Sequence, residues 1–311
     1  QLFPEGRRAV LRAALAEPGL PARLAAGARC IRAFRSASRE LSRMLTDLPE
    51  PGPAAAAGAP FRTTVTSLVT FASCPLRFHW SAVDRLPRRP SGARRRGIEI
   101  HRAIELHHRD GLPPEEAGEA LYDVPGGSDA PARDALAVFR AARCAAASPV
   151  LVEAPFELQI DRARLSGRID AVYAPEPDVW EVVDFKSGRR HPDPALRVQL
   201  EAYAVAVREA GFPDAPPGTR VTFAYLGGGS LEETTEVVDD DWRVTARAHL
   251  GVLLAGAASG ERSATPSEAC RGCDYSRLCP AGSAWLAEHP DPARKPRAPR
   301  PRRAPGSPAR R

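Results

Sequence analysis

The chain has 311 residues, of which 43% are hydrophobic, enough for one large domain or two small ones with an ordinary apolar core. No apolar stretch approaches the roughly 20 residues that a bilayer crossing needs, and no charged-then-apolar leader opens the chain. We therefore expect a cytoplasmic protein without membrane spans. The chain begins with Gln1 and its only methionine is Met44, from which we expect a piece of a longer protein.

The formal net charge of +6 is concentrated at the C-terminal end. Residues 288–311 hold eight basic and two acidic residues, whereas the rest of the chain carries equal numbers of both signs. Segments rich in Pro and Arg bury too little apolar area to fold. We predict a disordered basic tail over residues 283–311, interpreted as solvated, with a weak phosphate-binding arm as the alternative.

The predicted elements, taken in chain order, divide into a helical leader and a mixed domain. Residues 1–48 are predicted to be helical and residues 49–60 to be a linker, which places the main domain at residues 61–282. Within it, we predict helices at residues 67–83, 93–109, 130–148, 194–210 and 241–258. We predict strands at residues 150–160, 163–173, 179–186, 221–226 and 233–238. This order indicates an α/β or α+β sheet covered by helices.

The segment Glu-Val-Val-Asp-Phe-Lys-Ser-Gly at residues 181–188 contains the most informative chemistry. Side chains alternate along a strand, so Asp184 and Lys186 point to the same side near its end. Asp170 ends a neighbouring strand, and Gly167 before it permits close backbone approach. Two acids on adjacent strands can share Mg²⁺ or Mn²⁺, which polarises a phosphate and acidifies the attacking water.

A surface ion pair between Asp184 and Lys186 is the alternative interpretation. Of the 44 basic residues, however, only Lys186 and Lys295 are lysines. An ordinary surface cation in this chain would be arginine, so the retained lysine favours a functional role.

Four motifs follow one another in the domain: Glu153-Ala-Pro-Phe-Glu157, Ser166-Gly-Arg-Ile-Asp170, Val182-Val-Asp-Phe-Lys186 and Gln199-Leu-Glu-Ala-Tyr203. In this order and spacing they resemble the nuclease domains of the RecB and AddB helicase–nucleases and the Cas4 proteins, a branch of the PD-(D/E)XK superfamily. The resemblance implies a restriction-endonuclease-like core, with a mixed central sheet flanked by helices. It also implies that Asp170, Asp184 and the backbone carbonyl of Phe185 bind the metal ion, and that Lys186 is catalytic.

The resemblance extends to an earlier histidine and to three supporting residues. His101, in Gly97-Ile-Glu-Ile-His101, fits the position of a metal-ligating histidine on a helix. Gln199 and Tyr203 lie four residues apart on one helix face, where the resemblance implies contact with DNA or support of the catalytic strand. Glu153 is a candidate for positioning metal-bound water. His107 and His108 match no motif position and are interpreted as surface residues.

Three cysteines cluster at Cys270, Cys273 and Cys279, with two residues between the first pair, so that their thiolates can turn toward one centre. The resemblance to iron–sulfur nucleases of the AddB and Cas4 type supplies Cys74 as the fourth ligand. Four thiolates suit a [4Fe–4S] cluster or Zn²⁺, and the family spacing favours the cluster. It would act as a clip that joins the two ends of the nuclease domain.

The other two cysteines are Cys30 and Cys144, in alanine-rich helical stretches, and we interpret them as small apolar fillers. Six cysteines in a cytoplasmic chain argue against a disulfide framework.

The leading functional hypothesis is a metal-dependent DNA nuclease that acts on single strands or DNA ends in end processing and recombinational repair, as the C-terminal part of a UvrD/RecB-type helicase–nuclease. The sequence contains no Gly-x4-Gly-Lys-Ser/Thr phosphate loop, so the helicase motor is expected upstream in the same chain or in a partner subunit. Residues 1–48 are then candidates for its last helices, or a generic helical appendage. The alternatives are a catalytically silent DNA-binding or assembly module and a stand-alone Cas4-like exonuclease.

Overall fold

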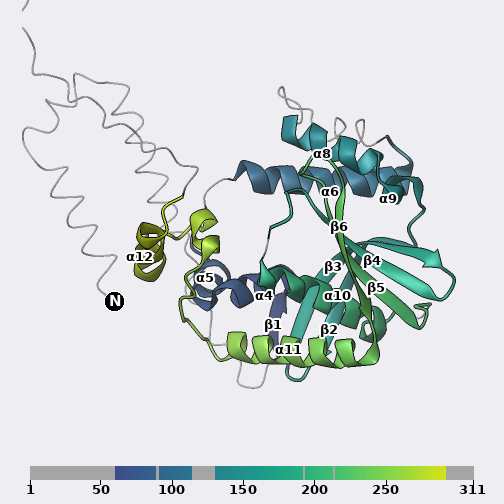
Figure 1. Ribbon diagram of the computed structural model, residues 1–311. Coiled ribbons are helices and arrows are strands. Elements are labelled where there is room, and N and C mark those ends of the chain that lie inside the picture. The colour runs from purple at the N-terminus through teal and green to yellow at the C-terminus, as the bar shows by residue number, and fades with distance from the viewer. Residues whose placement is uncertain (1–59, 89–90, 114–129, 192, 213, 292–311) are drawn as a thin grey trace, which may run out of the picture. The chain divides into compact units, whose positions relative to one another are not determined.

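The computed structural model describes residues 60–88, 91–113, 130–191, 193–212 and 214–291. The predicted helical leader, Cys30, residues 49–59 of the linker and the tail beyond residue 291 lie outside the described residues. Within the described part, six strands form a mixed sheet with helices on both faces (Figure 1). The predicted α/β architecture, a mixed central sheet flanked by helices, is therefore confirmed.

The sheet has the strand order β1-β3-β4-β5-β6, and β2 pairs with the other side of β3. The pairs β1–β3 and β4–β5 are parallel, and the remaining pairs are antiparallel. The strands are β1 (Phe61–Thr64), β2 (Leu151–Ile160), β3 (Ala163–Glu176), β4 (Val179–Lys186), β5 (Gly218–Tyr225) and β6 (Glu232–Val238). Sequence analysis missed β1, whose four residues lead directly into a helix.

Helices cover the sheet in two groups, each with its own apolar core. The first group packs on one face and comprises α4 (Val65–Ser73), α10 (Arg197–Glu209) and α11 (Asp240–Ala258). The second packs on the opposite face and comprises α6 (Gly92–Asp110), α8 (Ala130–Arg140) and α9 (Arg143–Ala146). Shorter elements are α5 (Pro75–Phe78), a π-helical turn at His79–Val83, 3-10 turns at Pro194–Leu196 and Glu268–Gly272, and α12 (Pro280–Glu288). None of the described helices is both long and apolar enough to span a membrane.

The side chains of β4 alternate between these two cores. Val182 packs in the core beneath α10, whereas Val183 and Phe185 pack in the core beneath α6 and α8. Asp184 and Lys186 therefore share the α10 face, as the alternation predicted.

Two predicted helices are interrupted in the structure. The helix expected at residues 67–83 breaks at Cys74, where the backbone is extended and Pro75 lacks the N–H that would continue the helix. The helix expected at residues 130–148 gives way to extended backbone at Ala142 and resumes only as the short α9. The first break places Cys74 at a helix junction.

The predicted start of the disordered tail at residue 283 is wrong, because α12 continues to Glu288. Pro280 suits the first turn of this helix, and the sulfur of Cys279 accepts a hydrogen bond from the Gly282 backbone N–H at 3.2 Å. The residues after Cys279, the last predicted cluster ligand, thus form a helix whose first turn this cysteine caps.

Candidate active site

The site lies at a fork where β3 and β4 separate. Their ladder includes the pair of Ala171 with Val183 and goes no further, although β3 extends back to Ala163 and β4 on to Lys186. At the fork, the backbone N–H of Phe185 donates to Asp170 Oδ2 at 2.9 Å. A carboxylate thus replaces the partner strand's carbonyl as hydrogen-bond acceptor, which fixes Asp170 beside the end of β4.

β2 brings Glu153 opposite Asp170. The β2–β3 register pairs the residues on both sides of these two, but not the two themselves. Glu153 has a φ of 48°, a left-handed conformation that is uncommon for a residue with a side chain. Strained backbone of this kind clusters at functional sites.

His101 of α6 completes a group with these two acids. Its Nδ1 lies 3.3 Å from Asp170 Oδ2. One ligand atom each from His101, Glu153 and Asp170 lies within 4.8 Å of the others. An imidazole and two carboxylates at this separation can hold a divalent cation. Glu153 therefore lies at the predicted metal site itself, whereas the sequence suggested only that it positions metal-bound water.

Asp184 and Lys186 begin a chain of polar contacts that leads to α10. Lys186 Nζ lies 2.7 Å from Asp184 Oδ2 and donates to Gln199 Oε1, also at 2.7 Å. Gln199 Nε2 then donates to the hydroxyl of the buried Tyr203 at 2.7 Å. Gln199 and Tyr203 share one helix face, as predicted, and they brace the lysine. Because Asp184 is fully buried and the Lys186 side chain is only 21% exposed, this is no surface ion pair.

The charges of the site act strongly on one another. Burial disfavours the protonated form of His101, but the negative charge of Asp170, with smaller effects from Asp184 and Glu153, outweighs it and raises the pKa to about 9. Burial raises the pKa of Asp184 to about 6, although the charge of Lys186 opposes the shift. Burial, reinforced by Asp170, also raises the pKa of Glu153. Carboxylates gathered in this way favour an added cation.

The oxygens of Asp184 provide an independent test of whether a metal fits. Apart from the ion pair with Lys186, neither oxygen accepts a hydrogen bond from any described residue. A buried carboxylate left this way is costly unless a proton or a cation completes its shell. Asp184 is not a member of the three-residue group that includes His101. It still lies at the fork near Asp170, because the next residue, Phe185, donates its backbone hydrogen bond to Asp170. The donor atoms gathered at the fork therefore suit a divalent cation.

Gly167 lies on β3 just before the fork, and the reason for a glycine there differs from the predicted close approach of backbone. A Cβ atom at this position would lie 2.5 Å from the ring of Phe156 and 2.8 Å from a methyl group of Val65. Side chains rather than backbone fill the space, so the requirement for glycine comes from the core beneath α10.

The interpretation of His107 and His108 as surface residues is wrong. Both are half-buried, because α8 and α9 cover the end of α6. The ring nitrogens of His107 lie 2.7 and 3.0 Å from the carbonyl oxygens of Leu112 and Ala145. His108 Nε2 lies 2.9 Å from the Tyr173 hydroxyl, and burial lowers the pKa of His108 to about 4. Cys144 is buried in the same core, as expected for an apolar filler.

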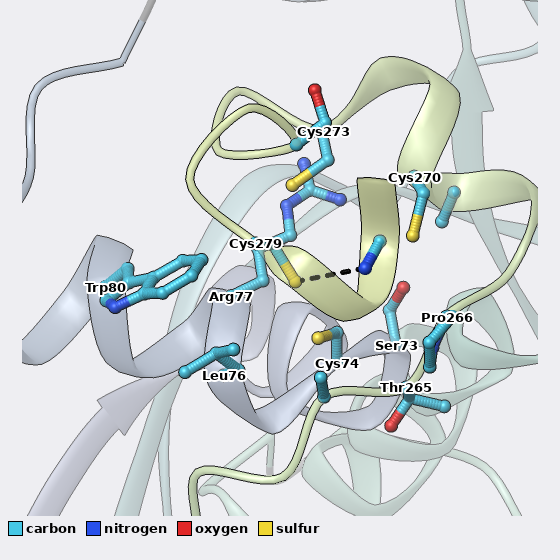
Figure 2. Close-up of a pocket in the computed structure, with 14 residues that line it drawn as sticks. Ser73, Cys74, Leu76, Arg77, Trp80, Thr265, Pro266, Cys270, Cys273 and Cys279 are labelled. Carbon is cyan, nitrogen blue, oxygen red and sulfur yellow. Dashed lines mark hydrogen bonds between the residues drawn. The ribbon is translucent and has the colours of Figure 1, made fainter. Parts of the chain in front are cut away.

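The four predicted cluster ligands, Cys74, Cys270, Cys273 and Cys279, line one cavity (Figure 2). Cys74 comes from the α4–α5 junction, and the other three come from the segment that leads into α12. Among these described cysteines, no three sulfur atoms lie within 4.8 Å of one another.

Two further residues shape this cavity, and sequence analysis found neither of them. A Cβ atom on Gly282 would lie 3.4 Å from the sulfur atoms of both Cys270 and Cys279, so the glycine leaves room next to them. The side chain of Arg77 extends beside Cys273 (Figure 2), where burial raises the pKa of the Cys273 thiol and the positive charge of Arg77 partly opposes that shift.

The cysteine segment is attached to the chain that precedes α6. The buried Tyr275 donates its hydroxyl hydrogen bond to the carbonyl oxygen of Leu86 at 3.1 Å, and its ring contacts Trp80 edge-on at 5.7 Å. Asp274 lies 3.5 Å from Arg94 of α6. The last part of the domain is thereby joined to the helix that carries His101.

The chain is similar to one protein family and to several solved structures. Residues 62–280 match the family model of the PD-(D/E)XK nuclease superfamily. No curated protein matches the chain. Among solved structures, SSO0001 is similar at 16% identity and a TM-score of 0.37, over 79% of this chain and 94% of that chain. A candidate exonuclease from Eubacterium rectale is similar at 15% identity and a TM-score of 0.47, over 78% of this chain and 92% of that chain. Because the family model covers well over half of its length, the chain belongs to the PD-(D/E)XK nuclease superfamily.

Proposed function

We propose that this chain is a metal-dependent deoxyribonuclease that hydrolyses phosphodiester bonds. In this proposal, His101, Asp170, Asp184 and the backbone carbonyl of Phe185 hold Mg²⁺ or Mn²⁺, and Lys186 is the catalytic residue. The observation that carries the proposal is the fork, where two strands part and leave the buried Asp184 with open lone pairs beside Asp170. We add Glu153 to the ligand set, because its carboxylate lies with His101 and Asp170.

The residues of the site divide the chemical work. A bound Mg²⁺ or Mn²⁺ ion would polarise the phosphate and lower the pKa of the attacking water. Lys186 places its ammonium group beside Asp184, where it stabilises the negative charge that develops on the phosphate oxygens. Gln199 accepts a hydrogen bond from the same ammonium and is itself held by Tyr203, which restricts the position of Lys186.

Replacement of Asp170 or Asp184 by Asn tests this assignment. We expect each variant to lose metal-dependent cleavage of linear DNA yet to retain DNA affinity, because the acids hold the metal whereas distributed cationic contacts hold the strand. Glu157→Gln is a matched control, since this glutamate is an exposed residue of β2 that pairs with arginines. Full cleavage by the Asp184→Asn variant would show that the catalytic centre does not lie at the fork.

We also propose that the four cysteines hold a [4Fe–4S] cluster with a structural role. The spacing of the four cysteines along the sequence, which resembles that of iron–sulfur nucleases, and the space left by Gly282 support a cluster over Zn²⁺. Protein purified without oxygen should be brown and contain iron and acid-labile sulfide, and Cys273→Ser should lower both the iron content and the melting temperature. Zinc in place of iron would contradict the cluster assignment.

We further propose that the nuclease works in DNA end processing and recombinational repair as part of a helicase–nuclease, with the motor in the same chain or in a partner subunit. The resemblance of the four motifs supports this context. A catalytically silent module is less favoured, because both acids and the lysine are present and lie together. The genomic sequence upstream separates the first hypothesis from a stand-alone Cas4-like exonuclease, since only the first requires helicase motifs in the same reading frame or in a neighbouring gene.

A further inference from the structure

A groove opens beyond the end of β4, between α8 and the loop that joins β5 to β6. It has a volume of about 840 Å³ and is lined by Ser187, the residue that follows Lys186. This volume falls in the range of about 300–1,000 Å³ that is typical of ligand sites. The groove also includes Arg96 of α6, so it lies at the end of β4 and along the helix that carries His101.

One wall of the groove is formed by α8 and is mostly apolar. Pro131, Ala137 and Ala141 are exposed along it, and the buried Val138 contributes behind them. These residues are small, so no long side chain fills the space. Asp134 is the acidic residue of this wall.

The opposite wall is polar and basic. It contains Arg96, Ser187, Arg189 and the loop between β5 and β6, Gly227-Gly-Gly-Ser230. Arg190 pairs with Glu232 at 3.3 Å, whereas the exposed side chain of Arg189 has no ion-pair partner among the described residues. The Cβ position of Gly97 in α6 lies 3.6 Å from Ser187 Oγ, so the turn of α6 that carries Arg96 flanks the same opening.

The loop is fixed against the end of the catalytic strand. The backbone N–H groups of Leu226 and Gly227 donate to the carbonyl oxygens of Lys186 at 2.8 Å and Gly188 at 3.1 Å. A Cβ atom on Gly227 would lie 2.5 Å from the carbonyl carbon of Gly188, so only glycine allows this crossing. The groove and the catalytic lysine therefore keep a constant spacing.

We propose that this groove binds a nucleotide of the substrate strand next to the scissile phosphate, with the base on the α8 wall and the phosphate at Arg189. This inference rests on the proposed function and specifies where its substrate lies. An apolar wall suits the face of an unstacked base, and an arginine that has no acidic partner in the described part of the chain suits a phosphate. A base within a duplex stays stacked on its neighbours and cannot reach the wall, so the groove selects for a single strand.

Two substitutions test the two walls separately. Ala137→Leu adds bulk to the apolar wall without changing the charge, and Leu favours a helix. Arg189→Ala removes the free cation. The matched controls are Ala248→Leu, at an exposed alanine of α11, and Arg162→Ala, at an exposed arginine in the β2–β3 turn. Binding is measured without metal ions, by fluorescence anisotropy, on a short labelled single strand and on a blunt duplex of the same sequence.

We expect each groove substitution to weaken single-strand binding by about fivefold or more, with duplex binding and both controls unchanged. Arg189→Ala should also lower the salt dependence of single-strand binding by about 0.7 in the logarithmic slope, the value for one lost phosphate contact, whereas Ala137→Leu should leave that slope as it is. Unchanged single-strand affinity in both variants, or equal losses on strand and duplex, would overturn the inference.

Cleavage of linear DNA by the wild-type chain with Mn²⁺ separates this inference from the function on which it rests. A chain that cleaves, but whose groove variants bind like the wild type, keeps the nuclease assignment and loses the groove. A chain that shows the expected binding pattern yet cleaves nothing keeps the groove and loses the assignment.

Discussion

Replacing Lys186 by Arg tests the catalytic assignment most sharply, because the change keeps the charge and follows the chain's own preference for arginine. In the structure, one nitrogen atom bridges Asp184 Oδ2 and Gln199 Oε1, with 2.7 Å to each. A guanidinium is planar and wider and favours paired contacts with a carboxylate. It would grip both oxygens of Asp184, which are otherwise without hydrogen bonds, and would leave Gln199 without its donor.

The expected cost follows from the loss of one positioned, charge-stabilising donor. Such a loss typically raises the barrier by about 2.7–4 kcal/mol, which corresponds to about 10²–10³ in rate. We therefore expect the Lys186→Arg variant to fold, but to cleave at least about a hundredfold more slowly in single-turnover assays at saturating Mn²⁺. Arg190→Lys is the matched control, because Arg190 pairs with Glu232 at the surface and should tolerate the reverse exchange. Near-normal single-turnover cleavage by the Lys186→Arg variant would refute the catalytic role.

Three further predictions concern pH and stability. Because the pKa of His101 is about 9, Mn²⁺ must displace a proton when it binds this imidazole. Calorimetry should therefore show proton release at neutral pH and a Mn²⁺ affinity that falls as the pH is lowered. A pH-independent Mn²⁺ affinity would exclude His101 as a ligand. The unfolding free energy of Glu153→Gly should exceed that of Glu153→Ala by about 1 kcal/mol in denaturant unfolding, because only glycine adopts a φ of 48° without strain. Both variants should bind metal weakly. Equal unfolding free energies would argue against backbone strain at Glu153. Arg143→Ala should lower the unfolding free energy by about 1–3 kcal/mol at neutral pH, because it leaves the buried Glu181 without its main partner. Burial would raise the pKa of Glu181, but hydrogen bonds from Arg143 and Thr222 lower it. The stabilisation by Arg143 is therefore present above the ordinary glutamate pKa and disappears as the pH falls through the lower pKa of the folded state. A stability difference between wild type and Arg143→Ala that persists in acid would contradict the pairing.

Local patterns predicted much of β4. β4 begins and ends at the predicted residues, and the period of two correctly placed Asp184 and Lys186 on one face. The same local logic placed Gln199 and Tyr203 together on α10. These features depend only on spacing along one element, which the sequence states directly.

Features that depend on how elements meet could not be predicted in this way. The left-handed backbone of Glu153 arises where β2 passes the fork, and a strand glutamate carries no mark of it in the sequence. The burial of His107 depends on α8 and α9, which follow more than twenty residues later. The groove had a visible sign in the glycine run at residues 227–229, but the residues of its α8 wall, such as Ala137 and Ala141, are ordinary helix residues in the sequence.

The cavity shared by Cys74 and the three later cysteines has a consequence for how the chain is made. About 200 residues separate Cys74 from Cys279, so at a synthesis rate of about 5–20 residues per second the first thiol leaves the ribosome roughly 10–40 seconds before the last. During that interval Cys74 has none of the three cysteines that share its cavity. The cavity in Figure 2 can form only after translation has passed residue 279, so this corner of the molecule is assembled late, and the Cys74 thiol is open to oxidation until then.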